Sequence, residues 1–175
     1  MNPVYRPNLP QMSPGALLSL TPQTDIIPAA PGPRVPKILV VDDNVVILKT
    51  ISIKLKAEGY EVRTAMDGTT AVSCVRRDRP DLIILDINFP PDTAHAGISW
   101  NGFTILDWLR RIDEARDTPI IFITSGESAK FRQRALEAGA VAFFEKPVNH
   151  EEMMNVIRHT VGEPPPYSPP DAPAI

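Results

Sequence analysis

The sequence predicts an α/β domain with a five-stranded parallel sheet covered by helices on both faces. Short, continuous apolar runs recur between residues 37 and 161, without the in–out alternation of half-exposed strands. A segment whose apolar residues have helical spacing follows each run. This regular alternation of strand and helix predicts a (βα)5 doubly wound sheet with right-handed crossovers.

The individual elements follow from these runs and from the residues that end them. Gly59 and Gly139 stand where a helix C-terminus requires a left-handed residue, and Pro80 and Pro119 lie just before the next strands. The expected strands are 38–41, 61–65, 82–85, 120–123 and 141–144. The expected helices carry Leu48, Ile51 and Leu55, then Ala71 and Val75, then Leu106 and Leu109, then Phe131, Ala135 and Ala138, and finally Met153, Ile157 and Val161.

The composition favours one domain with a substantial core, because 43% of the 175 residues are hydrophobic. A net charge of -3 gives no sign of a nucleic-acid-binding face or of a basic patch for membranes. Cys74 is the only cysteine, which excludes an intramolecular disulfide and suits a reducing cytosol. No apolar run approaches the roughly 20 residues that span a bilayer. We therefore expect a soluble, cytoplasmic protein whose partners include neither nucleic acid nor membrane.

The prolines separate the two ends of the chain from its middle. Nine of the 20 prolines fall in residues 1–36 and six in residues 163–175. Proline removes a backbone donor and fixes φ, so such segments favour extended, solvated chain. We predict disordered Pro-rich tails over residues 1–36 and 162–175 around a single domain at 37–161. Docking of a tail into an aromatic groove is the less common alternative.

Polar side chains follow four of the five predicted strands. Asp42 and Asp43 come after the first strand, Asp86 after the third, Thr124 after the fourth and Lys146 after the fifth. In an open parallel sheet, ligands bind beyond the carboxyl ends of the strands. We therefore expect these five side chains to gather in one small area.

The residue types in this area predict a divalent cation and phosphate chemistry. Three crowded carboxylates repel one another, and oxygen ligands without histidine or cysteine indicate Mg²⁺ or Mn²⁺. Lys146 and Thr124 offer a positive charge and a hydroxyl, which suit phosphate oxygens. A carboxylate beside a metal and a lysine can attack a phosphoryl group, so Asp86 is the expected nucleophile. Taken alone, Asp42 and Asp43 could equally be a solvated turn or a helix cap.

Four stretches of the sequence carry a resemblance to a known family. They are ILVVDDN at 38–44, DLIILDIN at 81–88, PIIFITS at 119–125, and EAGA at 137–140 leading to Lys146-Pro147. With these motifs, residues 37–161 resemble the receiver domain of response regulators, which has a flavodoxin-like fold. The resemblance implies a phosphorylation-switched signalling module of a two-component system. Asp86 would then accept a phosphoryl group from a histidine kinase or a histidine phosphotransfer protein.

The resemblance also implies a metal site. Asp43 and Asp86 would bind Mg²⁺ directly, and Asn88 would contribute its backbone carbonyl. Asp42 would act mostly through water.

A conformational switch is implied as well. Thr124 would move toward the phosphoryl group, Phe143 would follow inward, and Lys146 would bind the phosphoryl oxygens. Ordinary core packing is the alternative for Phe143. No helix-turn-helix, cyclase or methylesterase segment follows residue 161, so we expect the output to pass through an unknown downstream protein.

The connection after the phosphoacceptor position departs from the family pattern. Phe89-Pro90 occupies the place of the usual Met-Pro pair, but residues 91–100 intervene before Asn101. We expect this long segment, with His95 and Trp100 able to reach over the acceptor, to limit access for a kinase or phosphatase. A functionally neutral surface insertion is the alternative, because long loops are tolerated at little entropic cost.

Two other function classes compete with the phosphorylated switch. One is an adaptor that keeps the fold without phosphorylation. The other is an aspartate-nucleophile phosphatase of the haloacid-dehalogenase type, which requires a second aspartate two residues after the nucleophile. Asn88 stands at that place, so we expect no enzyme activity on a separate substrate.

Overall fold

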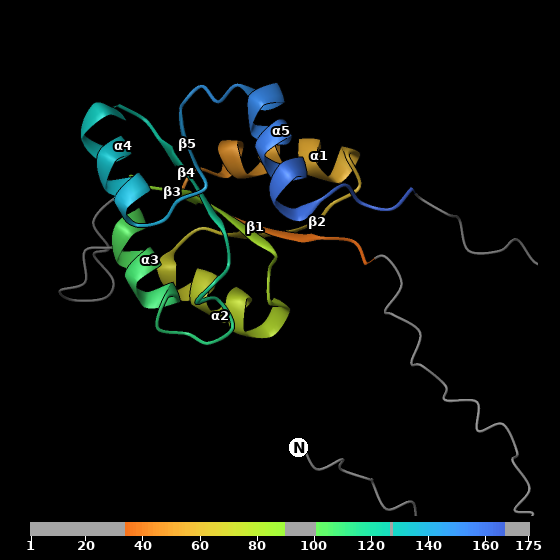
Figure 1. Cartoon of the computed structure of the whole chain (residues 1–175), viewed down its shortest axis with the longest axis horizontal. Helices are drawn as coiled ribbons and strands as arrows, with labels where there is room; N and C mark the ends of the chain where they lie inside the picture. Colours follow the sequence, from red (N-terminus) through yellow and green to blue (C-terminus); the bar gives the residue numbers. More distant parts are fainter. Residues whose placement is uncertain (1–33, 90–100, 127, 167–175) are drawn as a thin grey trace, which may run out of the picture. The chain divides into compact units, whose positions relative to one another are not determined.

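The structure is a computed structural model that describes residues 34–89, 101–126 and 128–166. A single parallel sheet with the strand order β2-β1-β3-β4-β5 forms its centre (Figure 1). Its strands are β1 (Lys37–Val41), β2 (Glu61–Ala65), β3 (Leu82–Asp86), β4 (Ile120–Thr124) and β5 (Ala142–Glu145). Its helices are α1 (Val45–Ala57), α2 (Gly68–Asp78), α3 (Gly102–Leu109), α4 (Ser128–Glu137) and α5 (His150–Val161).

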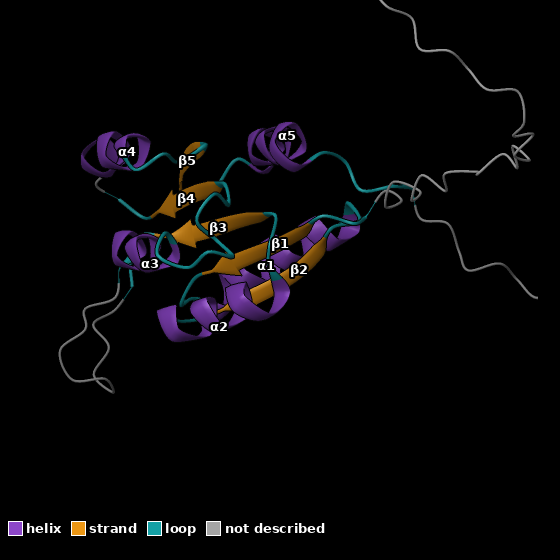
Figure 2. Ribbon diagram, turned by 60° about the horizontal axis from the view of Figure 1, so that its bottom comes forward, coloured by secondary structure: helices purple, strands orange, loops and turns teal. Residues whose placement is uncertain are grey.

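The predicted fold class is confirmed, since every strand is followed by a helix and all strand pairs are parallel. Helices α1 and α5 pack on one face of the sheet, and α2, α3 and α4 pack on the other (Figure 2). The fifth strand lies one residue later than predicted. Val141 is 46% exposed, and the ladder with β4 begins where Ala142 pairs with Ile121.

Alternate residues of the central strands supply two separate apolar cores. In β3, Ile83 and Leu85 pack toward α2 and α3, whereas Leu82 and Ile84 pack toward α1 and α5. All five residues of β3 are buried, so neither of its faces meets water. This two-sided burial explains why the central strands read as continuous apolar runs.

Asparagine side chains fix where several helices begin. Asn44 caps α1 by accepting hydrogen bonds from the amides of Val46 and Ile47, at 2.9 and 3.4 Å. Asn101 caps α3 and Asn149 caps α5 in the same way. Each cap satisfies amides that have no partner within the helix. The caps of α1 and α3 therefore set the paths by which the chain leaves β1 and returns after β3.

Residues at both margins of the domain lie against it. The Pro36 carbonyl accepts a hydrogen bond from the Glu61 amide at 3.1 Å, and the Tyr60 hydroxyl donates to the Gly162 carbonyl at 2.9 Å. The disorder predicted for the tails concerns residues that lie mostly outside the described ranges and stays a prediction. No helix in the described part of the chain has the length and apolarity needed to cross a membrane.

Gly102, the first residue of α3, lies against the backbone at the end of β3. A Cβ atom at this position would overlap the backbone carbonyl oxygen of Asp86 and would lie 2.8 Å from the Cα atom of Ile87. Neither backbone atom can rotate away, so only glycine lets α3 begin this close to the strand. The connection after β3 thus depends on a residue without a side chain.

We expect Gly102→Ala to lower the free energy of unfolding by about 1–3 kcal/mol, because overpacked sites shift the backbone. Gly139→Ala is the matched control. Gly139 has a φ of 77° but no neighbouring atom within 4 Å, so only the left-handed backbone is penalised, by roughly 1–2 kcal/mol. Urea unfolding measures both variants. A loss well below about 1 kcal/mol for Gly102→Ala would contradict this account.

Candidate functional site

The carboxyl ends of β1 and β3 place two acidic side chains next to each other. Val41 pairs with Leu85, so Asp42 and Asp86 each lie one residue beyond this pair. Both side chains are buried, with 0% and 2% exposure. Buried carboxylates require a positive partner, because loss of water penalises their charged form.

Lys146 supplies this positive charge from the turn after β5. Its Nζ donates to Oδ2 of Asp42 at 2.7 Å and to Oδ2 of Asp86 at 2.9 Å. The Lys146 amide also donates to the Thr124 carbonyl at 2.8 Å, which extends the β4–β5 ladder to the lysine itself. Three strands therefore converge on one buried ion pair network.

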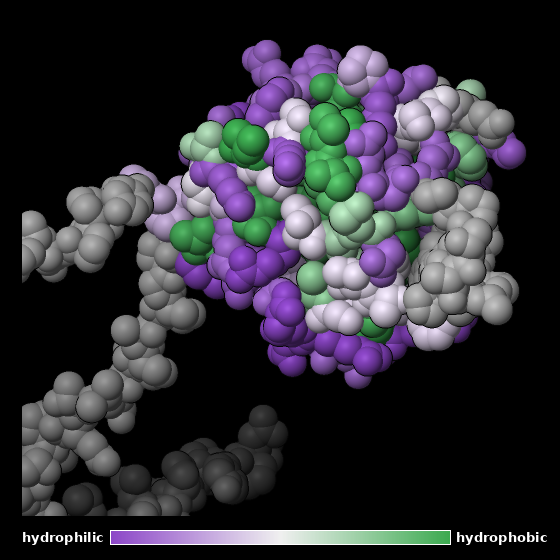
Figure 3. Space-filling model, turned by 180° about the vertical axis from the view of Figure 1, so that it is seen from behind, coloured by the Kyte–Doolittle hydropathy of each residue, from purple (hydrophilic) through white to green (hydrophobic). Residues whose placement is uncertain are grey.

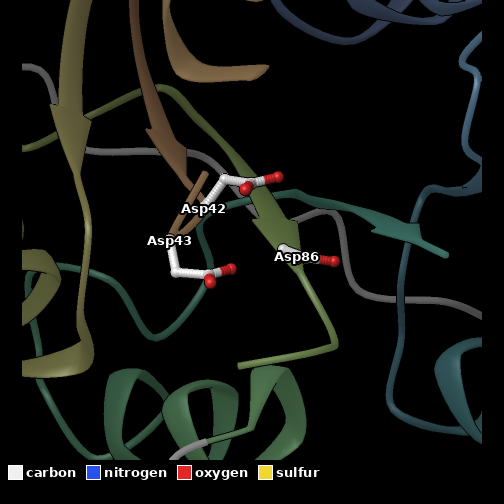
Figure 4. Close-up of side chains that lie close together, drawn as sticks. All are labelled: Asp42, Asp43 and Asp86. Atoms are coloured by element: carbon white, nitrogen blue, oxygen red, sulfur yellow. The ribbon is translucent and has the colours of Figure 1, made fainter. Parts of the chain in front are cut away.

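A third carboxylate completes an acidic cluster. Ligand oxygens of Asp42, Asp43 and Asp86 all lie within 4.8 Å of one another. Figure 4 shows the three side chains at the ends of β1 and β3 with their carboxylate groups pointing the same way. Oδ1 of Asp86 is buried and has no hydrogen-bond partner among the described residues. A hard divalent cation fits this set of oxygens, since it would satisfy the orphaned atom and offset the excess of negative charge.

Asn88 connects this cluster to the end of β4. Its side-chain amide donates to the Thr124 hydroxyl at 3.2 Å, to the Ser125 carbonyl at 2.9 Å and to the Ser125 hydroxyl at 3.1 Å. The Thr124 hydroxyl, which is buried, donates in turn to the Gly126 carbonyl at 3.3 Å. The hydroxyl is therefore already hydrogen-bonded on both sides.

Burial and neighbouring charges shift the pKa values of two site residues in ways that follow from the geometry. Burial raises the pKa of Asp86 to about 6, the charge of Asp42 adds to this, and the hydrogen bond from Lys146 opposes it. For Lys146, burial lowers the pKa, but the hydrogen bonds to the two carboxylates outweigh it and leave the pKa raised. The lysine therefore keeps its charge at neutral pH, whereas ionised Asp86 is held at an energetic cost.

The model of the response regulator receiver domain family matches residues 38–158. The chain belongs to this family. It is 39% identical over 113 residues to the response regulator PleD of Caulobacter vibrioides, which covers 65% of this chain and 23% of PleD. It is 32% identical over 123 residues to the DNA-binding regulator RpaA of Synechocystis, which covers 70% of this chain and 48% of RpaA.

Solved receiver structures share the fold of this receiver domain. The chemotaxis protein CheY4 of Vibrio cholerae superposes with a TM-score of 0.63 at 31% identity, covering 73% of this chain and 99% of CheY4. The receiver domain of the sensor kinase PA1611 of Pseudomonas aeruginosa has a TM-score of 0.62 at 28% identity and covers 74% and 99%. That structure has a magnesium ion coordinated in its active-site cleft.

The receiver domain brings most of the predicted site residues together. Asp42, Asp86 and Lys146 are joined by hydrogen bonds, and Asp43 lies within reach of the same space. Thr124 ends β4, next to the β5 turn that carries Lys146. The expected access-loop residues, His95 and Trp100, lie outside the described residues.

Phe143 occupies the core rather than the surface. It is 7% exposed and pairs with Phe122 of β4 in the sheet register. The guanidinium of Arg132, from α4, lies 5.1 Å from the centre of its ring. The buried position is compatible with both the switch role and ordinary packing.

Sequence reasoning missed the side-chain role of Asn88 and the contact between Asn44 and Asp42. The backbone amide of Asn44 donates a hydrogen bond to Oδ1 of Asp42 at 2.8 Å, so the residue that caps α1 also orients a site carboxylate. An asparagine two residues after a strand-end aspartate is a signal of loop bonding, but it does not name the partner.

The raised pKa of Asp86 predicts a pH-dependent effect of Asp86→Asn in the absence of divalent ions. A folded-state pKa above the unfolded value means that stability is lost as the pH rises through about 6. The variant escapes this loss, so its stability relative to the wild type should improve by up to roughly 3 kcal/mol between pH 4 and pH 8. Urea unfolding with a chelator present measures this difference.

Asp78→Asn is the control of opposite sign. The hydrogen bond from Arg77 lowers the pKa of Asp78, so removal of this carboxylate should remove stability that is present above its ordinary pKa. If the difference in stability between Asp86→Asn and the wild type is the same at pH 4 and pH 8, burial of an ionised Asp86 does not destabilise the fold.

Proposed function

We propose that this receiver domain accepts a phosphoryl group on Asp86 in a Mg²⁺-dependent reaction and passes the signal to a protein partner. The observation that carries the proposal is the unequal hydrogen bonding of the two carboxylate oxygens of Asp86. One of its oxygens accepts a hydrogen bond from Lys146, and the other is buried without a partner among the described residues, beside two further carboxylates. Response regulators receive signals from histidine kinases, so a kinase or a histidine phosphotransfer protein is the proposed donor.

The residues present divide the work of the transfer. One carboxylate oxygen of Asp86 attacks the phosphorus atom, and the bond from phosphorus to the donor imidazole breaks as the new phosphorus–oxygen bond forms. Lys146 exchanges part of its contact with the carboxylates for the equatorial phosphoryl oxygens and offsets their charge. Asp43, Asp86 and the Asn88 carbonyl are the proposed metal ligands, with Asp42 acting through water. The bound ion would neutralise the charge that develops during transfer.

The proposed switch follows from the hydrogen bonds at the end of β4. The Thr124 hydroxyl must leave the Gly126 carbonyl in order to donate to a phosphoryl oxygen. Phosphorylation shifts the conformational equilibrium only by the extra stabilisation that it gives to the rearranged state. Phe143 is the proposed aromatic residue whose packing responds, and the downstream partner is a protein that distinguishes the two states.

The geometry gives less support to the competing functions. A phosphatase of the haloacid-dehalogenase type needs an acid where Asn88 stands, and the Asn88 amide is occupied by Thr124 and Ser125. A phosphorylation-independent adaptor would not need three carboxylates and a lysine gathered in one cluster, with two of the carboxylates buried. The family match also favours a signalling module, since receiver domains are in general not classical enzymes.

The partners and the location of the whole protein are less well supported, because the relatives match this chain over only part of their own length. The chain spans about a quarter of PleD and about half of RpaA, so the remaining parts of those proteins have no counterpart in the match. RpaA is named as a DNA-binding regulator. The expected absence of nucleic-acid and membrane partners therefore stays a prediction, as does the cytoplasmic location.

Incubation with acetyl phosphate and Mg²⁺ should add one phosphoryl group to the full chain, detected by intact mass. Asp86→Asn should abolish the increase, because it removes the attacking oxygen and keeps the shape of the side chain. Circular dichroism checks that the variant is folded. Phosphorylation that persists in the folded Asn variant, or catalytic turnover of added phosphate esters, would refute this assignment.

Asp43→Asn should weaken Mg²⁺ binding about tenfold or more, because the cluster loses one charged oxygen ligand. Isothermal titration calorimetry measures the affinity. Asp117→Asn serves as the matched control. This exposed carboxylate precedes β4, so it lies toward the amino ends of the strands, away from the acidic cluster at their carboxyl ends. Equal Mg²⁺ affinities for the two variants would exclude Asp43 from the metal site.

A further inference from the structure

Large hydrophobic side chains are exposed where α1 lies beside the edge strand β2. Val45 is 43% exposed, Ile53 is 68% exposed, and Met66, directly after β2, is 47% exposed. Figure 3 shows hydrophobic side chains interrupting the hydrophilic surface on the face turned away from the view of Figure 1. Exposed apolar side chains that gather in one place mark a site where another molecule binds.

A groove of about 370 Å³ joins these side chains. Thr64 of β2 and Met66 line one side of this α1–β2 groove. The other side is lined by residues of α1, namely Val45, Leu48, Lys49, Ser52, Ile53 and Lys56. These positions recur at helical spacing, so they form one stripe along α1. The stripe rises about 16 Å, which is the length of three turns of a second helix.

The α1–β2 groove carries unbalanced positive charge. Its charged lining residues are Lys49 and Lys56, and none of the described residues that line it is a carboxylate. Neither ammonium group has an ion pair with a described residue, and α1 contains no acidic residue. Arg158, at the other end of the same face, is by contrast paired with Glu58 at 3.0 Å. The groove therefore favours an acidic occupant.

Ser52 gives an independent sign of a missing partner. It stands three residues after Lys49 and four before Lys56, and it is only 8% exposed. Its Oγ atom has no hydrogen-bond partner among the described residues. A buried hydroxyl without a partner carries a desolvation penalty. A polar group of an occupant would remove that penalty.

A protein helix fits these features better than an anionic membrane or a nucleic acid does. A groove that follows α1 for three turns accepts the rounded side of a second helix. A lipid surface would leave the buried Ser52 hydroxyl without a partner. Nucleic-acid phosphates would pair with the lysines but would leave the apolar lining exposed.

We propose that the α1–β2 groove binds an acidic amphipathic helix of a partner protein, which lies alongside α1. Two carboxylates seven residues apart on that helix pair with Lys49 and Lys56. An apolar side chain between them packs on Ile53, and a polar side chain reaches Ser52. The groove contains no residue of the acidic cluster, so this inference goes beyond the proposed phosphoryl transfer and does not rest on it.

A designed helical peptide tests the proposal with the full chain. The peptide is alanine-based and fluorescently labelled, and it carries two glutamates seven residues apart with one leucine and one asparagine between them. Fluorescence anisotropy should show saturable binding with a Kd on the order of 100 μM or tighter. Lys49→Glu combined with Lys56→Glu should weaken this binding about tenfold or more, because like charges then face each other.

A charge swap and a matched variant separate specific docking from general attraction. A second peptide with lysines in place of the glutamates should bind the double variant about tenfold more tightly than it binds the wild type. Lys54→Glu is the matched control, because Lys54 lies on the same helix but lines a different cavity, together with His150. This variant should bind the acidic peptide within about twofold of the wild type. Circular dichroism checks that each variant is folded.

Four outcomes would overturn the proposal. The first is the absence of saturable binding to the wild type, and the second is an equal loss of affinity in Lys54→Glu and in the double variant. The third is displacement of the peptide by phosphatidylglycerol vesicles, which would assign the groove to a membrane surface. The fourth is a dimer of the wild-type chain that the double variant abolishes, which would assign it to a second copy. Phosphorylation by acetyl phosphate is measured separately, so its failure would leave this result unchanged.

Discussion

The structure depends on one partly buried lysine held between two buried carboxylates. Asp42 and Asp86 lie at the ends of neighbouring strands with almost no exposure to water, and Lys146 contacts both of them. Without the lysine, two uncompensated negative charges would be buried side by side, which is strongly unfavourable. The ion pairs therefore fix the relative positions of the ends of β1, β3 and β5. They do not balance the charge of the whole cluster, because Asp43 adds a third carboxylate beside them, so a cation would be stabilised there.

The same burial that stabilises the fold creates the chemistry of the site. β3 is covered on both faces, so its last residue, Asp86, leaves water together with the apolar residues that precede it. This burial raises the pKa of the carboxyl group to about 6 and leaves one oxygen without a partner among the described residues. Close packing of α3 at Gly102 keeps the start of that helix against the strand. The raised pKa and the unpartnered oxygen of Asp86 thus follow from the strand's position in the middle of the sheet.

The fold and the centre of the site were predictable, because short stretches of sequence identify the strands and the general geometry of parallel sheets then brings the ends of the strands together. Continuous apolar runs indicate two-sided strands, and polar residues at their carboxyl ends converge in any parallel sheet. The hydrogen bonds of Asn88 were not predictable, because a loop side chain can point in several directions and its choice depends on β4. The contact of Arg132 with Phe143 and the orphaned hydroxyl of Ser52 depend in the same way on helix positions that no local pattern encodes.

Helix α1 lies between the acidic cluster and a groove lined by residues of α1 and β2. The backbone amide of its cap residue, Asn44, donates a hydrogen bond to Asp42, so the start of the helix is fixed to the acidic cluster. One side of the helix packs on the sheet through Leu48, Ile51 and Leu55. Another side, toward β2, forms the apolar groove whose lining includes two lysines. Val45 and Ile53, two of the exposed hydrophobic side chains of α1, line this groove, so they lie neither on the sheet-facing side of the helix nor in its contact with Asp42.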